Sequence, residues 1–287
     1  MGLLNTSNRA GASGQSAGGG GGNLGTFYTH QIEKSARFDA AGTSSNASRL
    51  TRTFSSVTSN TDFTLNFWIK RSGTGALGSN PQGSTRPHTF FTPRSSTSGS
   101  VLHEFSFMAP SSYGRGDALV VTNTNSGAYV LSSSSIYTDV TSWINIHMQF
   151  DLNNGTASEK VKFFINGTEA PYQTDNRSSF SSFSGIAAGA WTIGDYYNYG
   201  YSINAYIAQW AYTDGYTYAP TIFGETKNGV WIPKDFSSSV TWGNAGHWLK
   251  FADASNLGLD SSGQSNNWTV SNMGTDHQTP DSPTFGN

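Results

Sequence analysis

The sequence contains no cysteine, few charged residues and no long hydrophobic run. Without cysteine there is no disulfide framework, no thiolate metal site and no cysteine nucleophile. No apolar segment approaches the roughly 20 residues that cross a bilayer, so we expect no membrane insertion. The first residues also lack the basic segment and apolar core of a signal peptide, which predicts release by cell lysis or within a particle.

Charged residues make up only 12% of the 287 residues, against about 25% in a typical soluble domain. The net charge of −2 provides no long-range attraction to phosphate, and lysine and arginine form no cluster. Nucleic acid is therefore not an expected partner. The polar surface must come from serine, threonine, asparagine and glycine, which is typical of extracellular or virion β-proteins.

Alternating apolar and polar residues predict an all-β fold. A strand with a period of two sends every second side chain to one face. Two segments, 63–70 and 143–150, show this pattern clearly, and each predicts one core-facing row. The residues of these two rows are Phe63, Leu65, Phe67, Ile69, Ile144, Ile146, Met148 and Phe150.

A hairpin and many short strands complete the pattern. The apolar segment 161–165 leads into Asn166-Gly167, a pair that tolerates positive φ and predicts a β-hairpin. Many short strands separated by turn signals indicate a sandwich or a barrel. The predicted strands lie near residues 36–39, 48–54, 63–71, 88–92, 102–108, 118–122, 129–132, 143–151, 160–166, 190–193 and 205–212.

The composition divides the chain into three parts. Residues 1–34 form a Gly-rich arm, residues 35–218 form the sandwich, and residues 219–287 form a C-terminal extension that packs on the sandwich because too few strands remain for a separate core. The arm has too few apolar side chains to fold alone. It is either a passive linker or a segment that becomes ordered along a partner subunit.

Matches to catalytic motifs fall in the wrong structural context. Residues 14–18 fit G-x-S-x-G and residues 73–78 fit G-x-G-x-x-G, but neither lies between a strand and a helix. No two of the five glutamates are close in sequence, so the acid pair of a glycosidase is not visible. The six histidines have no zinc-site spacing. We therefore expect no enzyme activity, with a glycan-degrading enzyme as the least favoured alternative.

One segment favours carbohydrate binding. Four tyrosines fall within residues 196–201, more than one strand face can bury. Tyrosine presents a flat apolar ring with a hydroxyl group, on which a sugar ring can stack. Burial of these rings at the end of the sandwich or in a subunit interface explains the composition as well. The candidate carbohydrate-binding residues are Asp195, Tyr196, Tyr197, Asn198, Tyr199 and Tyr201.

A second polar segment provides weak candidates for a calcium site. Asp253, Asp260 and Asn266 lie in turns rich in serine and asparagine. Carboxylate and amide oxygens bind hard cations such as Ca²⁺. The same side chains also stabilise turns by bonding to the local backbone, and too few acidic residues are present for a strong site. We expect no required cofactor, with calcium as a secondary possibility.

The strand segments resemble a known fold family. Residues 36–39, 48–53 and 63–71 are similar to the opening strands of laminin-G-like, concanavalin A-like jelly rolls, and residues 143–151 and 161–167 resemble their central hairpin. In many relatives the Asp-Ser-Ser-Gly segment lies near the N-terminal strand. Here it begins at Asp260, which weakens the transfer of a calcium site.

The C-terminal segments 206–210, 229–234 and 249–268 extend this resemblance to large proteins of marine tailed bacteriophages. The resemblance implies a virion structural protein, such as a tail fibre, a tail tip or a capsid decoration. It also implies a lectin-like domain for host attachment through surface glycans, a homo-oligomer, and contacts with other virion proteins through the N-terminal arm. The alternative is an architectural capsid or tail subunit that binds no glycan.

Overall fold

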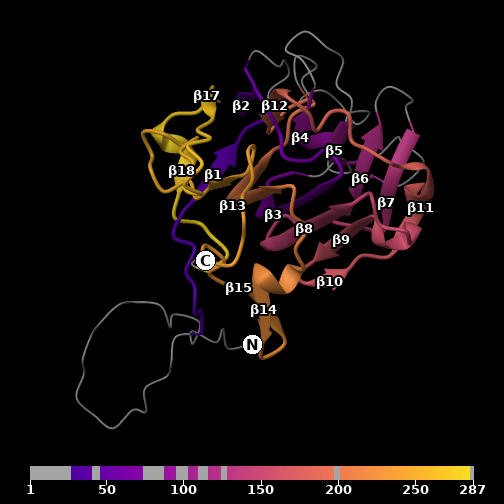
Figure 1. Ribbon diagram of the computed structural model, residues 1–287. Coiled ribbons are helices and arrows are strands. Elements are labelled where there is room, and N and C mark those ends of the chain that lie inside the picture. Colours follow the sequence, from indigo (N-terminus) through magenta and orange to yellow (C-terminus); the bar gives the residue numbers. More distant parts are fainter. Residues whose placement is uncertain are drawn as a thin grey trace.

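Two stacked antiparallel sheets form the protein (Figure 1). The computed structural model describes residues 27–40, 46–73, 87–94, 103–108, 116–123, 128–196 and 201–284. These residues contain no α-helix, and none of their helical turns has the length and apolar character required to cross a bilayer. The short 3-10 turns are η3 (Ala157–Glu159), η4 (Arg177–Ser179), η5 (Pro220–Ile222) and η6 (Thr275–His277).

The first sheet, sheet A, has eight strands in the described part of the chain. Its last strand in space, β18, comes from the C-terminal segment, and β16 from the same segment pairs with β13. The strands in spatial order are β10 (Thr168–Glu169), β9 (Val161–Ile165), β8 (Ile144–Asp151), β3 (Asp62–Arg71), β13 (Ala205–Asp214), β1 (Ser35–Phe38) and β18 (Gln278–Thr279), with β16 (His247–Leu249) beside β13.

The second sheet, sheet B, also has eight strands in that part of the chain. Their spatial order is β11 (Tyr172–Asp175), β7 (Ala128–Ile136), β6 (Ala118–Asn123), β5 (His103–Phe107), β4 (His88–Pro93), β12 (Gly189–Ile193), β2 (Arg49–Phe54) and β17 (Thr269–Ser271). The strands predicted from the sequence are thus confirmed, with shifts of a few residues at their ends. A separate hairpin consists of β14 (Gly224–Lys227) and β15 (Val230–Pro233).

The core lies between the two sheets and confirms the predicted inward-facing row of β3. Phe63, Leu65, Phe67 and Ile69 are all fully buried. Phe63 also stacks on Phe150 of β8, with ring centroids 4.1 Å apart. Burial of each such side chain stabilises the fold by roughly 1.5–3 kcal/mol. The hairpin at Asn166-Gly167 is confirmed as well, because both residues have positive φ (49° and 77°).

The outer face of sheet A is covered by residues that follow β13 in the sequence. Tyr218 O accepts hydrogen bonds from His147 Nε2 at 3.0 Å and Gln149 Nε2 at 2.8 Å. Trp231 Nε1 donates to Asn145 Oδ1 at 3.2 Å. A second apolar cluster forms in this layer from Ala211, Phe223, Phe236, Trp242 and Trp248. The polar alternate residues of β8 therefore meet protein instead of solvent.

The described start of the chain runs across the same outer face. Ile32 is buried beside Trp68, and its N–H donates to Thr284 Oγ1 at 2.9 Å. Lys227 Nζ donates to Phe27 O at 2.7 Å, which ties the segment to the β14–β15 hairpin. Residues 1–26 of the predicted arm lie outside the described residues. The domain boundaries at residues 34 and 218 stay predictions.

Candidate functional site

The loop after β12 carries the tyrosine-rich segment, and backbone hydrogen bonds fix its base. Gly194 N donates to Phe90 O at 2.9 Å, and Thr89 N donates to Tyr201 O at 3.0 Å. Gly194 has a φ of +93°, and a Cβ atom there would lie 2.4 Å from Phe38 Cδ1. Both the backbone angle and the lack of space therefore require glycine at the start of this loop.

Two of the predicted tyrosines contact each other at the two ends of the loop. The rings of Tyr196 and Tyr201 have centroids 5.2 Å apart with an interplanar angle of 34°. Both residues are half-buried. Tyr197, Asn198 and Tyr199 lie outside the described residues, so only the base of the predicted tyrosine cluster is placed.

Asp195 lies at the same loop base with its side chain turned inward. The carboxylate is fully buried, and its Oδ2 lies 3.7 Å from Nη1 of Arg49 at the start of β2. Thr92 Oγ1 of β4 donates to Asp195 O at 3.0 Å. Asp195 therefore holds the loop against β2 and β4, while the guanidinium side chain of Arg49 remains 19% exposed.

Buried ionisable groups lie on β3, β4 and β5 and just before β6. Arg71 Nη2 donates to Asp117 Oδ1 at 2.5 Å, and both side chains are 1% exposed. Burial, together with the nearby Arg71 guanidinium, lowers the pKa of His88 to about 4. Burial also raises the pKa of Glu104 to about 7, although Thr89 Oγ1 donates to its Oε1 at 2.5 Å.

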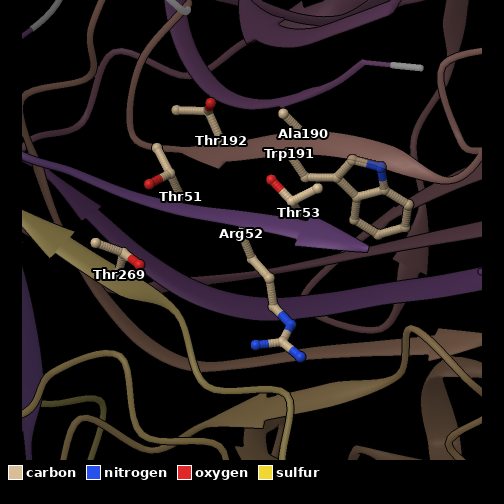
Figure 2. Close-up of a pocket in the computed structure, with 7 residues that line it drawn as sticks. All are labelled: Thr51, Arg52, Thr53, Ala190, Trp191, Thr192 and Thr269. Atoms are coloured by element: carbon tan, nitrogen blue, oxygen red, sulfur yellow. The ribbon is translucent and has the colours of Figure 1, made fainter. Parts of the chain in front are cut away.

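A threonine-lined hollow of about 110 Å³ lies on the outer face of sheet B (Figure 2). Figure 2 shows Thr51 and Thr53 on one side of β2 and the Arg52 side chain on the other. Leu50 and Phe54 of the same strand face the core. The residues that line the hollow are Thr51, Arg52, Thr53, Ala190, Trp191, Thr192 and Thr269.

Three strands bring these threonines together. Thr51 pairs with Thr192 of β12 on one side and with Thr269 of β17 on the other. Thr192 in turn pairs with Thr92 of β4, whose hydroxyl bonds to the backbone of the tyrosine loop. The hollow and the loop are therefore neighbours on sheet B.

Sequence reasoning did not identify this hollow. The alternation of Thr51, Arg52 and Thr53 between Leu50 and Phe54 is a usable signal, because it places both threonines on the solvent side of a strand. Nothing local indicates that β12 and β17 lie beside β2. Thr192 and Thr269 could therefore not be assigned to the same surface.

Asp260, a calcium candidate, accepts four hydrogen bonds from nearby residues. Its Oδ1 accepts from the N–H groups of Trp248 and Ser262, both at 2.9 Å. Its Oδ2 accepts from the Ser262 hydroxyl and the Asn266 N–H, both at 2.8 Å. Asp260 thus stabilises a turn and joins it to β16.

The other two calcium candidates also bond to protein groups. Asp253 Oδ1 accepts from the N–H and the hydroxyl of Ser255, at 2.8 and 2.6 Å. Asn266 Oδ1 accepts from Arg52 Nη2 at 2.8 Å. Across the ranges that the structure describes, no three acidic or histidine side chains are grouped so as to hold a metal ion. Calcium binding stays a prediction.

The sequence matches no protein family and no curated protein. Its structure, however, is similar to that of a putative carbohydrate binding protein from Bacteroides ovatus, with a TM-score of 0.56 at 12% identity. The match covers 84% of this chain and 58% of that protein, so the chain spans little more than half of its length. This similarity supports the predicted fold, a lectin-like jelly-roll sandwich.

Two other similar structures have lower scores. The heptameric SAP-like pentraxin from Limulus polyphemus has a TM-score of 0.46 at 13% identity, covering 66% of this chain and 78% of that one. The binding domain of botulinum neurotoxin serotype G has a TM-score of 0.38 at 11% identity, with coverage of 67% and 49%.

Proposed function

We propose that this protein is a structural protein of a bacteriophage particle, a tail fibre, tail tip or capsid-surface appendage, whose lectin-like sandwich attaches to host-surface glycans. The resemblance of residues 206–210, 229–234 and 249–268 to marine phage proteins supports the virion role. The name of the similar Bacteroides ovatus protein supports carbohydrate binding. The proposed role is binding, with a glycan-degrading enzyme as the least favoured alternative.

The observation that carries the proposal is the contact between Tyr196 and Tyr201 at the base of the loop after β12. A ring pair of this kind presents apolar area on which the C–H face of a sugar can stack. Arg49, partly exposed beside buried Asp195, supplies hydrogen-bond donors at the same place. Neutral sugar hydroxyls are suitable acceptors for these groups.

The position of the N-terminal segment supports attachment of the protein to a particle. In Figure 1 the β14–β15 hairpin lies at the bottom and β2 and β12 lie at the top. Because the described N-terminal segment bonds to the hairpin, an arm that anchors the protein would leave β2 and β12 on the far side from the particle. Several copies in one particle would raise avidity by about 10²- to 10⁴-fold without any new contact.

A glycan array with the full chain tests the proposal. We expect binding to neutral host-type glycans, and a loss of at least about tenfold in affinity when Tyr196 and Tyr201 are both changed to alanine, since apolar stacking area is removed. Tyr216→Ala is the matched control, because Tyr216 is 40% exposed but lies outside the loop. If the wild type binds no glycan on the array, and the tyrosine loop is buried between subunits in the particle, the protein is instead an architectural subunit.

A further inference from the structure

The outer face of sheet A is polar where the chain after β13 covers it. We call residues 215–250 the covering segment. Beneath it, Thr64, Asn145 and His147 are each no more than 1% exposed, and each hydrogen bonds to the segment. Tyr218 N donates to Thr64 Oγ1 at 2.9 Å, and Trp231 Nε1 donates to Asn145 Oδ1 at 3.2 Å. Because water can form the same hydrogen bonds, exposing this face costs less than exposing an apolar face.

The covering segment has an apolar cluster of its own. All residues of the second apolar cluster except Ala211 belong to the segment, and this cluster is separate from the core between the sheets. Segments with their own packing and a polar contact surface can open as local units, before the whole protein unfolds. At β16 the segment also enters the main core, through Ala245 and Leu249. The polar face and β16 are therefore two attachments that hold the segment on the sandwich.

His247 of β16 fits its position only as a neutral imidazole. Trp210 Nε1, which can only donate, donates to His247 Nε2 at 3.2 Å. His247 Nδ1 donates to Ala245 O at 2.8 Å. A proton on Nε2 would place two donors against each other. The ring is fully buried and stacks on Phe54 and Tyr212, so the closed segment excludes the charged form.

Two charged groups act on His247 in opposite directions. Burial lowers the pKa of His247 to about 4, the nearby Asp260 carboxylate opposes this change, and the Arg52 guanidinium adds to it. Burial also raises the pKa of the neighbouring Tyr212 well above its usual value, so that its hydroxyl stays neutral. The surroundings therefore keep His247 neutral while the segment is closed.

His147 is subject to the same restriction from the sandwich side. Its Nε2 donates to Tyr218 O at 3.0 Å, and its Nδ1 is buried without a hydrogen-bond partner among the described residues. A proton on Nδ1 would be an unpaired donor near the Phe223 ring, 5.3 Å away between centroids. On the same face of β9, Lys162 is paired with Glu159. Only removal of the segment gives water access to Nδ1.

We propose that the covering segment is an acid-sensitive lid, which stays closed on sheet A while His147 and His247 are neutral and opens when both take up a proton. The open form binds more protons than the closed form, so opening becomes more favourable as the pH falls below about 6.5. Opening exposes the polar face of β3 and β8 together with the apolar cluster of the segment. This device is independent of the proposed glycan binding.

Amide hydrogen exchange of the full chain, measured by mass spectrometry at pH 7.5 and pH 5, tests the proposal. The pKa is about 3 for His147 and about 4 for His247 in the closed form, against 6.5 for an exposed histidine. Each histidine should therefore favour opening about thirtyfold more at pH 5 than at pH 7.5. Protection of the amides in β14, β15 and β16, corrected for intrinsic exchange, should fall by about 10³-fold. Protection of β12 in sheet B should fall less.

Glutamine variants identify the groups that take up the protons. His147→Gln and His247→Gln should each remove about thirtyfold of the pH dependence. This ratio between two pH values stays informative for a variant with lower stability. His103→Gln is the matched control, because His103 on β5 of sheet B is also buried, with a pKa of about 4, but lies outside the covering segment. It should leave the 10³-fold fall of about the same size.

Two results would overturn the proposal. An equal fall of protection in β12 and in the covering segment would show that acid unfolds the whole protein without a separate opening. A fall that neither His147→Gln nor His247→Gln reduces would show that other groups bind the protons.

Discussion

Gly194→Ala should destabilise the protein and displace the base of the tyrosine loop. At a φ of +93°, any residue with a Cβ is strained, which costs about 1–2 kcal/mol. The new methyl group would also lie 2.4 Å from Phe38 Cδ1 and 2.9 Å from Ser48 O. Because a backbone oxygen cannot move as freely as a side-chain end, this crowding adds about 1–3 kcal/mol. The expected total loss is about 2–5 kcal/mol.

Gly263→Ala isolates the crowding from the backbone strain. Gly263 has a φ of +89°, close to that of Gly194, but an added Cβ would have nothing within 4 Å. Urea unfolding of both variants, followed by tryptophan fluorescence, should show a larger fall in the midpoint for Gly194→Ala, with the slope unchanged. Equal falls for the two variants would show that the contacts with Phe38 and Ser48 do not matter and would refute the packing argument.

Three further predictions use the same unfolding measurement. Burial lowers the pKa of His147 to about 3, whereas unfolded histidine titrates near 6.5. The unfolded chain therefore takes up the proton first, and stability is lost as the pH falls from 6.5 towards 3. At about pH 5 this residue alone lowers the free energy of unfolding by about 2 kcal/mol, and His147→Gln should reduce the pH dependence of stability. Asp214→Asn should cost about 1.5–3 kcal/mol, because its buried carboxylate accepts N–H groups on both oxygens; an unchanged midpoint would contradict this. Arg71→Met should cost about 3–5 kcal/mol, because it removes the guanidinium group that pairs with the buried carboxylate of Asp117, and adding Asp117→Asn should recover most of that loss.

The strands of the sandwich could be predicted because their signal is local. An alternation such as Phe63, Leu65, Phe67 needs only the pleat of one strand to define a buried face. The turn at Asn166-Gly167 likewise depends only on the φ angles that two adjacent residues tolerate. Neither inference requires knowledge of which strand lies beside which.

The candidate site was predictable only where one segment carries it. The tyrosine content of residues 196–201 indicated a binding loop directly. The direction of Asp195 was not predictable, because its partner Arg49 lies on a strand far away in the sequence. The hollow is a still clearer case, since Thr51, Thr192 and Thr269 become neighbours only when β12, β2 and β17 pair.

The amino-acid order alone established an all-β chain with one apolar face per strand, because side-chain direction in a strand follows a period of two over a few residues. Long-range pairing decided the rest. His147 occupies a polar position of its strand, yet it is fully buried under Tyr218, because a segment some 70 residues later covers sheet A. The threonine face of sheet B, in contrast, retains a hollow. Which face is covered depends on contacts between distant segments, and no local pattern encodes them.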